Sequence, residues 1–167
     1  MLSKTLEEAL NEQVNSEYYS SFLYLSMSSY FETMNLLGMA KWMRMQYEEE
    51  IMHAIKIFDM IVDMEGTVKL KPVDGPPTDF KSPLDVFKKS LAHERKVTGM
   101  INDIYSLARK ENDYAVQSAL QWFIDEQVEE EKSALEIVRQ LEMIGDETTP
   151  LLMLDSKVGS REPRSEE

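Results

Sequence analysis

The chain has 167 residues, of which 43% are hydrophobic and 29% charged, so it is long enough for one domain with a real core and has an ordinary globular composition. Its net charge of −13 excludes a nucleic-acid binder, which needs a basic surface, and no apolar run approaches the roughly 20 residues of a membrane helix. The absence of cysteine excludes disulfides, zinc–thiolate sites and iron–sulfur clusters, and together with the lack of a secretory signal pattern it favours a cytoplasmic protein.

The first half of the chain predicts two long helices followed by an irregular connection. The first helix is expected at about 4–33, where Ser3 can act as its N-cap. The second helix is expected at about 38–65 and ends before Gly66, since glycine favours helix ends. Residues 66–83 hold two of the six glycines and four of the six prolines, so this stretch predicts one long connection without regular structure.

The second half of the chain predicts two more long helices and a short one. Ser82 can cap a helix whose first position is Pro83, and this third helix is expected to end near residue 111. The fourth helix is expected at about 112–145, and a shorter fifth helix at about 149–158.

The lengths of the connections predict how these helices pack. Short connections make helices one and two antiparallel neighbours, and likewise helices three and four. The long connection can run the length of the bundle. The sequence therefore predicts an all-α four-helix bundle with one long crossover between helices two and three and a short fifth C-terminal helix. The expected domain covers residues 1–160, and residues 161–167 are expected to form a mobile C-terminal tail.

The core positions of the four long helices carry the most informative pattern. In a bundle these positions recur with alternating steps of three and four residues, and we call each series a core stripe. In helices one to four, the core stripes are Leu6, Leu10, Gln13, Glu17, Ser20, Tyr24, Met27 and Phe31; Met39, Met43, Gln46, Glu50, His53, Ile57, Met60 and Met64; Leu84, Phe87, Leu91, Glu94, Thr98, Ile101, Tyr105 and Ala108; and Val116, Leu120, Phe123, Gln127, Glu130, Ala134, Ile137, Leu141 and Ile144. Every core stripe is apolar toward its ends and polar near its middle. Because the middles of helices of similar length meet in a bundle, we expect the polar side chains to converge in one interior place. These residues are Glu17, Glu50, His53, Glu94, Gln127 and Glu130.

Buried carboxylates must be paired, protonated or bound to a metal. None of the four core stripes contains Lys or Arg, so the missing positive charge is most simply a metal ion. Oxygen donors with a single imidazole suit iron or manganese better than tetrahedral zinc. Glu50 and His53 form a Glu-x-x-His pair on one helix face, which is a ligand motif of di-iron carboxylate bundles. The alternative is a purely structural polar core.

At these residues the chain resembles the haem-free ferritins of bacteria and archaea. The resemblance covers roughly residues 4–160 and includes "NSEYYSSFLYLSMSSYF", "EEEIMHAIKIFD", "LAHE" and "QWFIDEQVEEE". It implies an iron-storage protein with ferroxidase activity, which oxidises Fe(II) with O₂ or peroxide and keeps the ferric mineral inside a hollow homo-oligomeric shell, usually of 24 subunits. Such a protein serves iron homeostasis.

The resemblance also assigns ligands. Glu17, Glu50 and His53 would hold the first iron of a di-iron centre, and Glu50 would bridge to a second iron held by Glu94 and Glu130. Gln127 would lie beside the oxygen-binding position, and Tyr24 would hydrogen-bond the centre and supply an electron.

A third iron position is implied at four glutamates of helices two and four, which are Glu49, Glu126, Glu129 and Glu130. Three of them lie at i, i+3 and i+4 and share one helix face. The alternative for this group is a solvated acidic face.

The sequence differs at two places from bacterioferritins and most di-iron oxidases, and these differences favour a storage ferritin. Val97 follows Glu94 at i+3, and Glu130 follows Gln127, so the second Glu-x-x-His of bacterioferritins and most di-iron oxidases is missing. Ile51 stands where bacterioferritins place their haem methionine, so no haem is expected. The alternative functions are a stand-alone di-iron oxidase or peroxidase of rubrerythrin type, and a helical interaction protein without metal.

Overall fold

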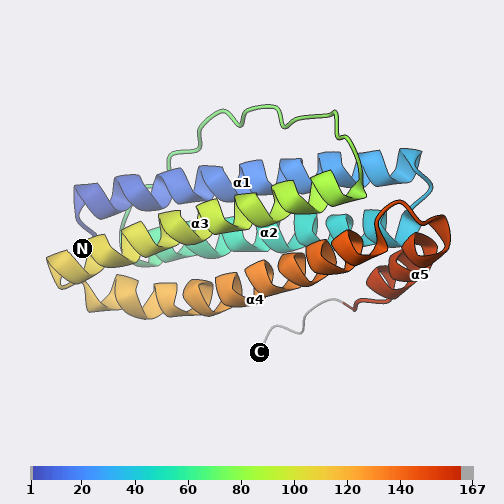
Figure 1. Cartoon of the computed structure of the whole chain (residues 1–167). Helices are drawn as coiled ribbons and strands as arrows, with labels where there is room; N and C mark the ends of the chain where they lie inside the picture. The colour runs from blue at the N-terminus through green and yellow to red at the C-terminus, as the bar shows by residue number, and fades with distance from the viewer. Residues whose placement is uncertain (1, 163–167) are drawn as a thin grey trace.

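The computed structural model describes residues 2–162, and within them it contains five α-helices and no β-strand. Four long helices lie side by side as a bundle, and a short one lies across one end (Figure 1). The helices are α1 (Lys4–Thr33), α2 (Leu37–Asp63), α3 (Pro83–Glu111), α4 (Tyr114–Ile144) and α5 (Thr148–Gly159). The predicted ferritin-like bundle is therefore confirmed. No helix in this part of the chain is long and apolar enough to cross a membrane.

The helix ends follow local side-chain chemistry. The Ser3 hydroxyl accepts a hydrogen bond from the amide of Leu6 at 3.1 Å, and the Ser82 hydroxyl accepts one from Asp85 at 3.1 Å, as N-caps do. α2 ends two residues earlier than predicted, because Glu65 takes a left-handed conformation with φ of 60°. The amide of Gly66 then donates to the Ile61 carbonyl at 2.8 Å and closes the helix end.

The crossover between α2 and α3 runs along the bundle beside α1, as expected (Figure 1). Asn11 fixes its start, since its amide nitrogen donates to the Thr67 carbonyl at 3.0 Å and its side-chain oxygen accepts from the Lys69 amide. Ser26 fixes it further on by donating to the Pro77 carbonyl at 2.6 Å. These bonds satisfy backbone groups that no regular structure serves.

α5 is fastened to the start of α2, which has no side-chain cap of its own. The Asp155 carboxylate accepts from the amides of Gly38 at 3.1 Å and Met39 at 2.7 Å, so it caps α2 from a distant part of the chain. A side chain at position 38 would come within 1.9 Å of the Asp155 carbonyl oxygen, and this close approach requires glycine. Residues 163–167 of the predicted tail lie outside the described residues.

The bundle interior has two apolar regions with a polar layer between them. One apolar region surrounds Phe31 and Phe87, and the other surrounds Leu10 and Phe123. All positions of the four core stripes are buried except five half-buried ones, which are Met64, Leu84, Thr98, Tyr105 and Ile144. The polar layer is therefore as well shielded from water as the apolar regions on either side.

Candidate metal centre

The polar layer brings the first group of expected ligands together. One ligand atom each of Glu17, Glu50 and His53 lies within 4.8 Å of the other two, and all three side chains are buried. α1 supplies the first residue and α2 the other two, one helical turn apart. His53 Nδ1 lies 3.4 Å from Glu50 Oε2, so the imidazole already faces the carboxylate. This is the arrangement of side chains that can hold one metal ion.

Two buried oxygens of this group accept no hydrogen bond from residues 2–162. Among the described residues neither Glu17 Oε2 nor Glu50 Oε2 accepts a hydrogen bond, although Gln13 donates to the other Glu17 oxygen at 2.6 Å. Burial raises the pKa of Glu17 and of Glu50 well above the ordinary value, and neighbouring carboxylates raise both further. Acceptors without donors in a dry layer of like charges fit a bound cation.

Glu94 of α3 lies on the other side of the layer, where two side chains donate hydrogen bonds to its carboxylate. The Tyr24 hydroxyl donates to its carboxylate, and Gln127 Nε2 donates to Glu94 Oε2 at 3.1 Å. Ser90 Oγ lies 3.1 Å from the Tyr24 hydroxyl. Burial, followed by the charge of Glu130, raises the pKa of Glu94 to about 8. Burial and the Glu94 charge raise the pKa of Tyr24 well above 10, so the phenol keeps its proton and remains a donor.

Glu130 of α4 completes this side of the layer. It is 1% exposed, and its Oε2 accepts a hydrogen bond from Gln46 Nε2 at 2.7 Å. The charges of Glu94 and Glu130 both raise the pKa of Glu50, so the two sides of the layer interact electrostatically through that residue. We call the set Glu17, Glu50, His53, Glu94 and Glu130 the buried centre. The sequence predicted all five residues, and the structure buries all five in one layer.

The residues of the expected third iron position are arranged differently. Glu49 is buried, Glu126 is half-buried and Glu129 is exposed, with its carboxylate 3.7 Å from Lys132 Nζ. We call these three glutamates, which share Glu130 with the buried centre, the accessory position. Among residues 2–162, no three of these four glutamates offer ligand atoms within 4.8 Å of one another. Glu49 instead receives two hydrogen bonds from Arg161 Nη2, at 2.8 and 2.9 Å.

Some supporting residues were missed by the sequence analysis. Gln13 and Gln46 occupy core-stripe positions, so the periodicity of the sequence could have predicted that they are buried beside the carboxylates. His93 lies off the stripe, yet it is buried with Nε2 2.7 Å from Ser20 Oγ, and burial lowers its pKa to about 4. It is therefore a neutral supporting residue. Arg161 carried no sequence signal, since it follows the last predicted helix.

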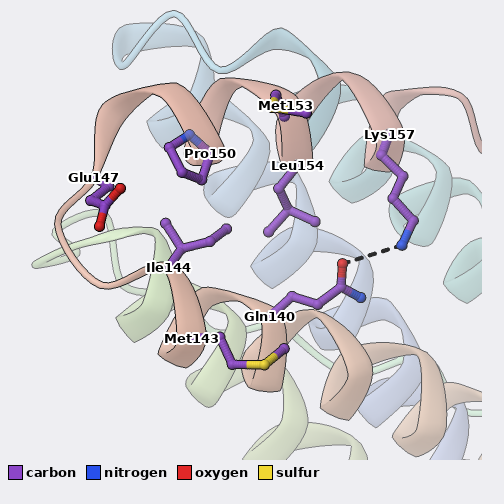
Figure 2. Close-up of a pocket in the computed structure, with 8 residues that line it drawn as sticks. All are labelled: Gln140, Met143, Ile144, Glu147, Pro150, Met153, Leu154 and Lys157. Carbon is purple, nitrogen blue, oxygen red and sulfur yellow. Dashed lines mark hydrogen bonds between the residues drawn. The ribbon is translucent and has the colours of Figure 1, made fainter.

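A pocket at the end of the bundle, between α4 and α5, has a different character (Figure 2). Its walls are largely apolar, with Ile144, Pro150 and Leu154 facing one another, and Lys157 Nζ donates to Gln140 Oε1 at 3.2 Å across it. Glu147 is the one carboxylate among the lining residues described. A pocket with this lining does not provide the ligands that a metal ion requires.

Comparison with known proteins agrees with the geometry. The model of the ferritin-like domain family matches residues 7–144. A bacterial non-heme ferritin of Bacteroides fragilis is 40% identical over 161 residues, which cover 96% of this chain and all of the relative. A bacterial non-heme ferritin of Staphylococcus aureus is 38% identical, covering 96% of this chain and 97% of the relative.

A solved structure is similarly close. The open pore ferritin of the hyperthermophilic archaeon Archaeoglobus fulgidus superimposes with a TM-score of 0.96 at 46% sequence identity. The match covers 97% of this chain and 100% of that one.

Proposed function

The chain belongs to the ferritin family, and from that premise we propose that it oxidises Fe(II) at the buried centre and stores the ferric product inside an oligomeric shell. The observation that carries this proposal is the pair of buried acceptor atoms, Glu17 Oε2 and Glu50 Oε2, which lie beside the His53 imidazole and accept no hydrogen bond from any described residue. Fe(II) supplies positive charge to these buried oxygens.

The residues divide the task by their positions. Glu17, Glu50 and His53 bind one ion, and Glu94 and Glu130 bind a second ion, with Glu50 shared between the two. Carboxylates are hard anionic donors, so they stabilise Fe(III) more than Fe(II) and favour oxidation. Each Fe(II) loses one electron, and O₂ or hydrogen peroxide accepts it. The second ion has no imidazole ligand, so the ferric product leaves that side more readily.

Tyr24 and Gln127 support the second ion. Both donate to Glu94, so they orient its carboxylate and reduce the charge it presents before iron arrives. Tyr24 is also proposed to give an electron to the centre. The accessory position is proposed to bind a third iron, and the shell is proposed to contain 24 subunits. No haem is part of this proposal. The cytoplasmic location, which rests on the lack of cysteine, stays a prediction.

The proposal is tested by adding Fe(II) in large excess to the assembled protein in air. We expect Fe(II) oxidation faster than in buffer alone, measured by absorbance. We also expect the mineral to stay in solution inside the shell, which measurements of the size and mass of the particles detect. Oxidation followed by precipitation from a small oligomer would contradict storage and favour a stand-alone di-iron oxidase or peroxidase. No oxidation above the buffer rate would contradict both iron functions.

A further inference from the structure

Arg161 is the first residue after α5 whose side chain reaches the polar layer. Its Nη2 donates to both oxygens of Glu49, and its Nη1 donates to Gln46 Oε1. The guanidinium carbon lies 5.3 Å from the ring centre of Trp42, and the side chain is only 18% exposed. Hydrogen bonds between two ionised groups are stronger than neutral ones, and the partial burial of Arg161 strengthens its contact with Glu49 further.

The same arginine also reaches the buried centre through one intermediate. Because the Gln46 side-chain oxygen accepts from Arg161, its NH₂ group must face the other way, where it donates to Glu130 Oε2 at 2.7 Å. Arg161 therefore contacts Glu49 directly and fixes the orientation of the amide that holds Glu130. Both contacts are with residues of α2.

The docking of α5 determines where Arg161 lies. Asp155 caps the start of α2, Lys41 Nζ donates to the Gly159 carbonyl at 2.9 Å, and Gly159 packs directly against Gly38. A surface pocket of about 300 Å³ between α4 and α5 is lined by Trp42 and Arg161 among others. A cation in this pocket would therefore lie beside the positive charge of Arg161.

We propose that Arg161 is the resident cation of the accessory position, and that a metal ion binds at Glu49 only after displacing its guanidinium. This inference rests on the proposed function, since it concerns the third iron. The Glu49 oxygens that would bind the metal already accept from Arg161, and two cations at one carboxylate repel each other. Glu17 and Glu50 each keep one oxygen that accepts no hydrogen bond from a described residue, so the side of the buried centre that these two residues form fills first.

The test compares the full assembled chain with the substitution Arg161→Gln, using Zn²⁺ as a redox-inert probe in a calorimetric titration. We expect the ion at Glu17, Glu50 and His53 to bind the variant as it binds the parent protein, since the contacts of Arg161 are with Glu49 and Gln46. The third ion should bind about tenfold more tightly, or better, once the charged hydrogen bonds no longer compete. Lys157→Gln is the matched control, since it removes the same charge from the same pocket but contacts Gln140 rather than Glu49.

Hydrogen exchange provides a readout that a merely structural role would not move. The amides of Ser160 and Arg161 donate to the carbonyls of Lys157 and Val158 at 3.2 and 3.3 Å. In the parent protein, exchange in residues 157–162 should rise with the third equivalent of Zn²⁺ and not with the first two.

The outcomes separate this inference from the proposed function. An unchanged third affinity in Arg161→Gln, an equal gain in Lys157→Gln, or no third ion in either protein would overturn the role of Arg161 while leaving the buried centre standing. Failure of the parent protein to bind the first two ions would overturn the proposed function itself.

Discussion

The buried centre and the accessory position are both acidic, yet the protein treats their charges in opposite ways. In the buried centre, Glu17 and Glu50 each keep an oxygen without a hydrogen-bond donor among the described residues. In the accessory position, Glu49 receives two hydrogen bonds from Arg161, and Glu129 lies beside Lys132 at the surface.

The difference teaches that a cluster of glutamates is not by itself a metal site. What distinguishes Glu17 and Glu50 from Glu49 and Glu129 is whether a Lys or Arg side chain among residues 2–162 contacts the carboxylate. Where it does, the carboxylates are stable without metal, and an incoming ion must compete with a side chain. Where it does not, the metal-free protein keeps raised pKa values and unsatisfied acceptors, and an incoming ion relieves both.

The largest effect is expected from Glu50→Ala. This change removes a ligand from both proposed ions, so fast Fe(II) oxidation should fall by roughly a hundredfold or more in stopped-flow absorbance measurements. Glu48→Ala is the matched control, because Glu48 is an exposed glutamate on the same helix. This variant should oxidise Fe(II) at the parent rate. Equal oxidation rates for Glu50→Ala and the parent protein would contradict the claim that iron is oxidised at the buried centre.

Acid should weaken metal binding at the buried centre. Burial and the charge of Glu130 raise the pKa of Glu94 to about 8, so this carboxyl holds a proton at neutral pH until metal arrives. Burial raises the pKa values of Glu17 and Glu50 in the same direction. Binding must then release protons, and affinity should fall about tenfold per pH unit for each proton released as the pH drops below 8.

Calorimetry of Zn²⁺ binding in buffers of different ionisation enthalpy measures this proton release. Release of one or more protons per subunit at pH 7 is expected for the first two ions. Binding at pH 7 without proton release would mean that the carboxyls are already ionised, against the account of a centre without counter-charge.

Tyr24→Phe should have a smaller effect. It removes the donor to Glu94 without removing a ligand, so we expect Fe(II) oxidation roughly tenfold slower, with two ions still bound per subunit. Tyr19→Phe is the control, since it also removes one hydroxyl from α1 but its ring contacts His93. If both variants slowed equally, the Tyr24 contact with Glu94 would have no specific role.

The smallest effect is expected from Glu129→Gln. Glu129 is exposed and its partner Lys132 lies at the surface, where solvent screens the interaction. The initial oxidation rate should stay within about twofold of the parent rate. A loss of oxidation rate comparable to that of Glu50→Ala would mean that the accessory position is also essential for oxidation, which would contradict the difference between the two regions.

The sequence predicted the fold and the buried centre because both depend on periodicity. Steps of three and four residues located the core stripes, and a polar interruption at one level of each stripe located Glu17, Glu50, His53, Glu94 and Glu130. The predicted helix boundaries followed from caps such as Ser3 and Ser82. The predicted end of α2 was two residues too late, because Glu65 adopts a left-handed conformation.

The environment of Glu49 could not be predicted in the same way. Arg161 is 112 residues away along the chain and belongs to no periodic pattern, so only the docking of α5 on α2 brings it to Glu49. Spacing on one helix shows which side chains share a face. It does not show which distant cation covers that face.

The most direct test of the central claim is the anomalous scattering of crystals soaked anaerobically in Fe(II), measured at the iron absorption edge. We predict two strong peaks per subunit in the polar layer, one among Glu17, Glu50 and His53 and one between Glu94 and Glu130, with the peak at Glu49 weaker while Arg161 is present. A polar layer without iron, or iron at Glu49 alone, would contradict the account.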